Sequence, residues 1–379
     1  MTSAVDRVEI FVVPVPFRRP FVLGSGVVGG TAAAGDVVFV KLTATDGSVG
    51  WGEQRALPSW SYETADTIRS VIEHQLSRLV IGSLPVAVER YHRSATRMLS
   101  PSVSNGFPFA RAAVEMALHD LVGRQLGVPI SALLGGAVHS RIPLTSAIGV
   151  GAPSEVADRM AESADYHAYK IKISGDVEHD VAALRAAAAG AKGKPLWLDA
   201  NQSYRPAALY KLLERIRDVP GVCCLEQPVP STDWGALARL RSGGIRLPIA
   251  VDEGSFSAAD LARTATLGGV DLAVVKICKA GGLRPATRTA AVAAAHGIEI
   301  LASGLTDTGV GFAAAMHLFS LYDLALPAEL NGPELLAELY VDGLDIVDGS
   351  ATVPTGAGLG IEVDGDRIRG TATGHVVVV

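Results

Sequence analysis

The chain has 379 residues, of which 33 are lysine or arginine and 39 are aspartate or glutamate, so its formal net charge is −6. This length exceeds a small domain and suits a barrel of about 250 residues with a companion domain. The weakly acidic balance argues against a nucleic-acid partner, and three cysteines are too few for a disulfide framework. No apolar run approaches the roughly 20 residues of a membrane span. We therefore expect a soluble cytoplasmic protein.

The first third of the chain predicts a small mixed unit. Alternating apolar residues predict a strand over Val5–Val15, and Asp36–Glu53 predicts two strands that turn at Asp46-Gly47. The Gly- and Ala-rich stretch Phe21–Gly35 predicts a mobile loop between them. Helical spacing then covers Tyr62–Leu79, Pro85–Leu99 and Phe107–Leu126. Strands followed by helices are typical of an α+β unit, which closes near residue 135.

From residue 142 onward, strand-like and helical patterns alternate. Uniformly apolar strands separated by helices are typical of a parallel sheet that is covered on both sides. Eight apolar runs are candidate strands: Ile142–Ile148, Ala168–Ile173, Pro195–Asn201, Gly221–Pro228, Leu247–Gly254, Asp271–Gly282, Ile298–Ala302 and Leu324–Leu330. Beyond Asp342 the pattern changes to short β-like runs, and we expect this segment to return to the N-terminal unit.

Five of these runs carry an ionisable residue at or near their ends, 24 to 27 residues apart. They are Lys172, Asp199, Glu226, Asp252 and Lys276. A strand, a loop, a helix and a returning loop need roughly 25 residues, so each interval is one βα unit. Parallel strands wound in succession place all their C-terminal ends on one face. We therefore expect these side chains to converge at one mouth.

Three carboxylates without His or Cys form the ligand set of a hard cation. Mg²⁺ prefers oxygen ligands, with Mn²⁺ as a substitute, so Asp199, Glu226 and Asp252 are the expected metal ligands. A single carboxylate at a strand end is as often a cap or a loop partner. Three carboxylates that recur at the strand ends together with two lysines favour a metal site instead.

Lys170 and Lys172 lie two residues apart in a strand, so both point into the predicted barrel. Because two neighbouring ammonium groups repel one another, we expect at least one of their pKa values to fall toward neutrality, which makes Lys172 a candidate base. Lys276 would lie across the barrel from it. A base on each face of a carbon next to a metal-bound carboxylate allows removal of its proton through an enediolate that the cation stabilises.

The motifs that carry these residues resemble those of the enolase superfamily, in its muconate lactonizing enzyme (muconate cycloisomerase) subgroup. They are Lys170-Ile171-Lys172, Asp199-Ala200-Asn201, Glu226-Gln227-Pro228, Asp252-Glu253 and Lys276-Ile277-Cys278-Lys279. The resemblance extends over nearly the whole chain, to Leu134-Gly135-Gly136 and the closing segment Gly358–Glu362. The mandelate racemase subgroup places a His-Asp pair on later strands, and Lys276 argues against it.

The resemblance implies an α/β fold, a modified TIM barrel of the (β/α)7β type with an α+β capping domain. The N-terminal region, residues 1–135, and the C-terminal segment, residues 341–379, would form the cap, and residues 136–340 the barrel. It implies Mg²⁺ on the three carboxylates, Lys172 and Lys276 as the acid/base pair and Lys170 as an electrostatic helper. It also implies a homo-oligomer.

The substrate side departs from the family pattern. Relatives of the lactonizing type have a Glu on strand seven where this chain has Asp307, and the last strand offers Glu329 as a further candidate for substrate binding. We also expect Trp60 and Asn201 beside the substrate, Asn201 with Glu253 in a supporting shell. Packing explains Trp60 equally well, and a structural carboxylate explains Glu329.

The predicted function is a cycloisomerase of the muconate lactonizing type that acts on a small carboxylate. Racemisation or epimerisation of amino-acid derivatives and dehydration of the hydroxyproline type are alternatives on the same site. A non-catalytic metal-binding barrel is a distant one. The residues that would select the substrate lie on loops, so the sequence does not identify it.

Overall fold

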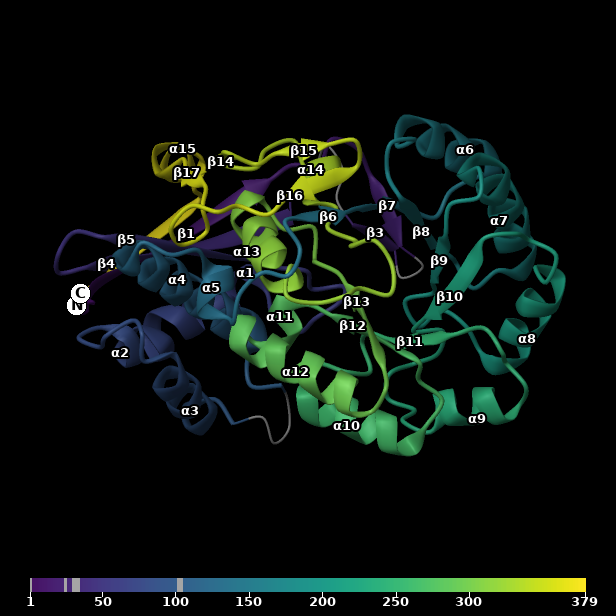
Figure 1. Cartoon of the computed structure of the whole chain (residues 1–379), viewed down its shortest axis with the longest axis horizontal. Coiled ribbons are helices and arrows are strands. Elements are labelled where there is room, and N and C mark those ends of the chain that lie inside the picture. The colour runs from purple at the N-terminus through teal and green to yellow at the C-terminus, as the bar shows by residue number, and fades with distance from the viewer. Residues whose placement is uncertain (1, 24–25, 29–34, 101–104) are drawn as a thin grey trace.

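A computed structural model describes residues 2–23, 26–28, 35–100 and 105–379. Its N-terminal unit contains a four-stranded antiparallel sheet in the order β18-β1-β4-β5. These strands are β1 (Val5–Val15), β4 (Gly35–Ala44), β5 (Val49–Arg55) and β18 (Gly374–Val378). The last strand of the chain thus pairs with the first, and Figure 1 shows both ends of the chain close together beside this sheet.

Helices cover one side of this sheet. They are α1 (Ala65–Val71), α2 (Ser77–Val80), α3 (Val88–Met98) and α4 (Pro108–Leu126), with a π-helical turn η1 (Ile72–Leu76) between the first two. The predicted helix Tyr62–Leu79 is therefore shorter at its start and interrupted. The predicted loop Phe21–Gly35 is wrong where it is described, because β2 (Phe21–Leu23) and β3 (Gly26–Val28) form an antiparallel pair. The rest of that stretch, 24–25 and 29–34, lies outside the described residues.

The strands of the barrel sheet lie between Thr145 and Ala302, and the bridging residues Ala328 and Glu329 follow them. Seven parallel strands follow one another in the order of the sequence. They are β7 (Thr145–Ile148), β8 (Ala168–Lys172), β9 (Leu196–Asp199), β10 (Val222–Glu226), β11 (Ile249–Val251), β12 (Leu272–Val275) and β13 (Glu299–Ala302). The helices on the outside of this sheet are α6 (Pro153–Glu162), α7 (Val177–Ala191), α8 (Pro206–Arg215), α9 (Ala236–Ser242), α10 (Ala258–Leu267), α12 (Leu283–Ala295) and α13 (Gly309–Phe319). The modified TIM barrel expected from the sequence is confirmed.

The barrel closes differently from the eight full strands predicted. The first predicted strand divides into β7 and a separate β6 (Arg141–Pro143), which pairs with β16 (Ser350–Thr352). The eighth is reduced to two bridging residues: Ala328 pairs with Leu144, and Glu329 pairs with Ser303. A short bridge is enough here because the backbone groups of these two residues bond to the strands on either side, with Thr145 N donating to Ala328 O and Glu329 N donating to Ala302 O.

The remaining short elements connect these parts. They are α5 (Ile130–Leu133), α11 (Ile277–Ala280), α14 (Gly332–Leu335), β14 (Val341–Asp342), β15 (Ile346–Val347), β17 (Glu362–Val363) and α15 (Gly365–Thr371). Helix α4 is buried on nearly all sides between the cap and the barrel. Its Glu115 accepts hydrogen bonds from Leu283 N and Arg284 N in the first turn of α12, at 2.7 and 2.9 Å. Within the described residues, no helix combines the length and the apolar character that crossing a membrane requires.

Strand β5 and helix α4 approach so closely that glycine is required between them. A Cβ built on Gly52 would lie 2.0 Å from the carbonyl oxygen of Ala113, and one on Gly50 would lie 2.3 Å from that of Ala117. Both contacts are with helix backbone, which cannot move aside without shifting α4. The small residues on this strand therefore set how near the sheet comes to the barrel-facing helix.

We predict that Gly52→Ala destabilises the protein by about 1–3 kcal/mol, because the added methyl group overpacks this contact. The matched control is Gly370→Ala in α15, where a Cβ meets nothing within 4 Å. The control should be neutral or slightly stabilising, since alanine favours a helix over glycine. Urea unfolding of both variants measures the difference, and equal stabilities would contradict the prediction.

Glu63 caps the N-terminus of α4, where the cap residue Phe107 supplies no side-chain hydrogen bond. Its carboxylate accepts from Phe109 N at 2.8 Å and from Ala110 N at 3.0 Å. Burial raises the pKa of Glu63 from 4.5 to about 7, against the lowering effect of these two hydrogen bonds. Between these two values the folded chain binds more protons at this group than the unfolded chain does. Its contribution to stability therefore falls as pH rises through this window.

We predict that Glu63→Gln removes this pH dependence, because glutamine keeps an acceptor oxygen and does not ionise. Relative to the unchanged protein, the variant should gain stability from pH 4.5 to pH 7, by at most roughly 3 kcal/mol at about 1.36 kcal/mol per pKa unit. Urea unfolding at several pH values measures the gap between the two proteins. A gap that stays constant across the window would contradict the prediction.

Candidate active site

The register of the barrel sheet pairs the first three predicted residues with one another across neighbouring strands. Lys172 at the end of β8 lies beside Asp199 at the end of β9, and Asp199 lies beside Glu226 at the end of β10. Asp252 follows β11 directly, and Lys276 follows β12. All five side chains are buried, as parallel strands of matched length require when their ends meet inside one mouth.

Lys170 lies at the centre of this group and is 1% exposed. Its Nζ is 3.0 Å from Asp199 Oδ2, 2.9 Å from Glu226 Oε2 and 3.4 Å from Glu329 Oε2. It also lies 4.4 Å from the ring centroid of Trp197, the residue beside it on β9. One ammonium group thus faces carboxylates from three separate segments of the barrel.

The two lysines proposed as an acid/base pair each contact a different carboxylate. Lys172 Nζ lies 2.5 Å from Asp199 Oδ2 and donates to Asn201 Oδ1 at 3.1 Å. Lys276 Nζ lies 2.6 Å from Asp252 Oδ2 and 4.5 Å from the ring centroid of Trp60. Three strands separate β8 from β12, so the two ammonium groups reach the mouth from different sides.

A supporting layer links these groups to the cap. Glu253 Oε1 accepts from Trp60 Nε1 and from Asn201 Nδ2, both at 3.2 Å. Trp60 stacks on Phe256 with ring centroids 5.3 Å apart. Trp60, which the sequence analysis places beside the substrate, therefore also packs between the cap and the barrel mouth.

Sequence reasoning missed the role of Lys279. Its Nζ donates to Asp252 Oδ1 at 2.7 Å and to Asp252 O at 2.9 Å, and the side chain is buried. Lys276 and Lys279 are three residues apart across the short helix α11, which places both on one side. This i, i+3 spacing was the signal in the sequence that would have found it.

The lysine pKa values differ from the expectation. Burial by itself lowers the pKa of Lys170, but the charges of Asp199 and Glu226 outweigh it and hold that pKa well above its usual value. Lys276 behaves in the same way because of Asp252. The pKa of Lys170 therefore does not fall toward neutrality, since its nearest charged neighbours are carboxylates. Lys279 is the lysine whose pKa is lowered, by burial against the opposing pull of Asp252.

The pKa values of the buried carboxyl groups are also shifted in opposite directions. Burial would raise the pKa of both Asp199 and Asp252, but the lysines beside them lower it below its ordinary value. Burial and the charge of Asp199 raise the pKa of Glu226 well above its ordinary value. Burial and the charge of Asp252 raise the pKa of Glu253 to about 7. The group therefore holds more buried carboxyl groups than its ammonium groups fully compensate.

The donor chemistry fits a hard cation, although the side chains face lysines. Across the part of the chain that the structure describes, no three His, Cys, Asp or Glu side chains are grouped closely enough to hold a metal ion. Glu226 Oε2 contacts Lys170 Nζ but makes no hydrogen bond, and the buried Glu253 Oε2 has no hydrogen-bond partner. Carboxylate oxygens are the ligands that a hard divalent cation takes in proteins.

Glu329 and Asp307 lie in different surroundings. Glu329 belongs to the central network, with Ser303 Oγ donating to Oε2 at 2.5 Å and Asn331 Nδ2 donating to Oε1 at 2.6 Å. Asp307 lies in the loop after β13, where its Oδ2 accepts from Leu305 N at 3.2 Å. The structure thus brings Glu329 to the lysines and places Asp307 between the barrel and the cap.

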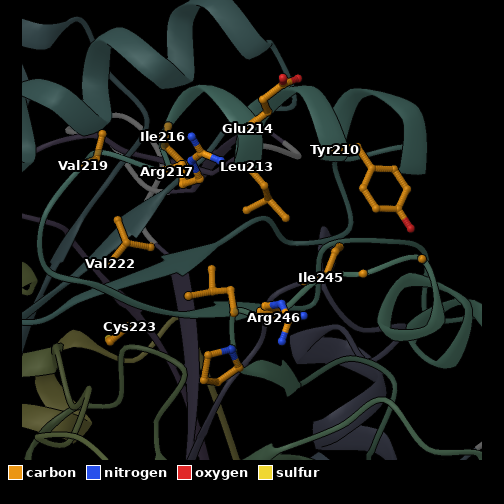
Figure 2. A pocket seen from close by; sticks show the side chains of 14 residues that line it. Tyr210, Leu213, Glu214, Ile216, Arg217, Val219, Val222, Cys223, Ile245 and Arg246 are labelled. Carbon is orange, nitrogen blue, oxygen red and sulfur yellow. The ribbon is translucent and has the colours of Figure 1, made fainter.

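The pocket in Figure 2 lies at the other end of the barrel. It has a volume of about 600 Å³ and is lined by Val222 and Cys223 from the start of β10 and by residues 243–248 ahead of β11. Strand β10 runs from this pocket to Glu226 at its far end. The pocket contributes no group to the lysine and carboxylate cluster.

The comparisons with known proteins agree with this architecture. A family model described as "Mandelate racemase / muconate lactonizing enzyme, N-terminal domain" matches residues 7–135, and one described as "Enolase C-terminal domain-like" matches residues 153–367. A chloromuconate cycloisomerase of Cupriavidus necator is 31% identical over 378 residues, covering 96% of this chain and 98% of its own. An N-succinyl-L-Arg/Lys racemase of Bacillus cereus is 26% identical, covering 96% of this chain and 97% of its own.

Solved structures extend this likeness to the fold. The 2-chloromuconate cycloisomerase of Rhodococcus opacus matches with a TM-score of 0.90 at 28% identity, over 98% of this chain and all of its own. The two family models together span the cap and the barrel, and these relatives are named as isomerases. The chain therefore belongs to the muconate lactonizing enzyme subgroup of the enolase superfamily and is an isomerase of that superfamily.

Proposed function

We propose that this enzyme moves the proton on the carbon next to the carboxylate of a small substrate, as a cycloisomerase of the muconate lactonizing type. The observation that carries the proposal is the pair Lys172 and Lys276, which reach one buried mouth from different sides. The relative at 31% identity, a chloromuconate cycloisomerase, supports the choice of reaction.

Asp199, Glu226 and Asp252 would hold Mg²⁺, with Mn²⁺ as a substitute. When bound, the cation supplies a Lewis acid that stabilises negative charge on the substrate carboxylate. Lys170 provides positive charge among the same carboxylates, and Lys279 fixes the orientation of Asp252. Asn201 holds Lys172 through the 3.1 Å hydrogen bond, so the amine that exchanges a proton with substrate keeps one position.

The lysines carry the proton. In the lactonizing direction, one ammonium group delivers a proton to the carbon next to the carboxylate, while a carboxylate oxygen of the substrate closes the ring. In the reverse direction the resulting amine removes that proton as the ring opens, so protons balance over the cycle. Trp60 and the buried cap contacts exclude water from this transfer.

A second reaction uses the same groups. Removal of a proton by one lysine and its return by the other would racemise an amino-acid derivative, and the 26% identical N-succinyl-L-Arg/Lys racemase favours this candidate. Dehydration of the hydroxyproline type is a third outcome of the same proton removal. The homo-oligomeric assembly and the cytoplasmic location expected from the sequence stay predictions.

We predict that Lys172→Ala and Lys276→Ala each reduce exchange of the substrate α-proton in deuterated water by about 10²–10⁴-fold, the usual contribution of a positioned acid or base. Mass spectrometry of muconates, their lactones, N-acylated amino acids, dipeptides and proline derivatives measures the uptake and identifies the reaction. Lys211→Ala, at an exposed position on α8, is the matched control. Exchange that survives in both active-site variants would exclude this function.

We predict that a chelator abolishes this exchange and that added Mg²⁺ or Mn²⁺ restores it. Asp252→Asn should weaken Mg²⁺ binding, measured by calorimetry, because one anionic ligand is lost. Asp260→Asn, outside the site on α10, should bind the metal as the unchanged protein does. Full activity after exhaustive chelation would show that the carboxylates serve only the lysines.

A further inference from the structure

The loop that carries Asp307 joins β13 to α13 and has a constrained backbone. Thr306 adopts a φ of 57°, in the left-handed region that favours glycine. A threonine stays in this conformation only when its surroundings hold it there. The neighbours of this loop therefore decide where Asp307 places its carboxylate.

Two side chains of the cap hold this loop, one on each side of Asp307. Arg55 Nε donates to Thr306 O at 2.7 Å. Glu53 accepts from Thr308 N at 2.6 Å and also from Thr308 Oγ1. Residues 53 and 55 are two apart on β5, so their side chains leave the same face of the strand. Both side chains are 1% exposed.

The surrounding chain leaves the loop little room. A Cβ on Gly332 would lie 1.8 Å from the Asp307 carbonyl oxygen, and one on Gly311 would lie 2.8 Å from both Asp307 Cβ and Glu53 Oε1. Arg55 is fixed in turn, with Nη1 donating to Gly35 O at 3.1 Å and its guanidinium 5.1 Å from the ring centroid of Phe17. The loop is thus held on both sides of Asp307, by Arg55 at Thr306 and by Glu53 at Thr308.

We propose that Glu53 and Arg55 are positioning residues for Asp307, which act on substrate binding through the loop that carries this aspartate. This rests on the proposed function together with the expectation from the sequence that Asp307 contacts the substrate. Neither cap residue contacts the lysines in the hydrogen bonds and ion pairs of the described chain, so they act through the loop. The expected consequence is an effect on substrate binding greater than that on the proton transfer.

The test is a double-mutant cycle between Arg55→Lys and Asp307→Asn, run with a carboxylate that the unchanged enzyme exchanges. Lysine keeps the charge but not the planar geometry that bonds Thr306 O and Gly35 O together. Arg55→Lys should raise KM about tenfold with kcat changed less than about threefold. In the Asp307→Asn background the same change should alter KM less than about twofold, because the carboxylate that it positions is already gone.

Thr308→Val tests the contact between Glu53 and the loop, since it removes the hydroxyl that donates to Glu53 and keeps the backbone N–H. It should repeat the KM effect and its dependence on Asp307. Arg93→Lys, at an exposed position on α3, is the matched control and should change neither constant.

Equal fold-changes of KM in both backgrounds, for Arg55→Lys and for Thr308→Val, would overturn the inference and leave Glu53 and Arg55 as structural residues. Thermal unfolding, measured alongside, reports stability alone and separates a weakened fold from a misplaced Asp307. If the proposed function itself is wrong, exchange of the substrate α-proton will not depend on Lys172 and Lys276. The two failures are therefore distinguishable.

Discussion

The structure depends on the neutralisation of buried carboxylates by buried ammonium groups at the barrel mouth. Moving an unpaired carboxylate out of water costs several kcal/mol, and Asp199, Glu226 and Asp252 are all fully buried. Lys170 compensates the charge of the first two, while Lys276 and Lys279 share Asp252. The lysines that we propose as the acid and base and their neighbours therefore also allow the barrel to close over these carboxylates.

Residues of the cap also hold parts of the barrel in place. Close contact between β5 and α4 fixes the height of the sheet over the barrel, and Glu115 on α4 caps a barrel helix. Because of this rigid attachment, side chains at the end of β5 reach the loop of Asp307. The proposed acid, base and metal ligands thus lie at the ends of parallel strands, while the neighbouring α+β unit holds the loop of Asp307.

Much of the site followed from periodicity. The recurrence of an ionisable residue every 24 to 27 positions predicted that five strand ends converge, and the strand register pairs the first three of these residues directly. The charge state of the lysines did not follow, because the sequence showed Lys170 beside Lys172 but not that Glu226 and Glu329 surround it. Lys279 was missed because a short helix, not a strand, carries it to Asp252. The eighth strand was overestimated since its closing role needs only two residues.

By itself, the sequence determined the α/β architecture, the order of the strands and the identity of the groups at their ends, because these depend on local pattern and on chain length between repeats. Only the tertiary structure decided which carboxylate each ammonium group contacts and which cap residues hold the loop of Asp307. The bonds from Arg55 to Thr306 and from Glu53 to Thr308 join residues 251 and 255 positions apart. No local pattern records such pairs, since they arise from the way the cap packs against the barrel.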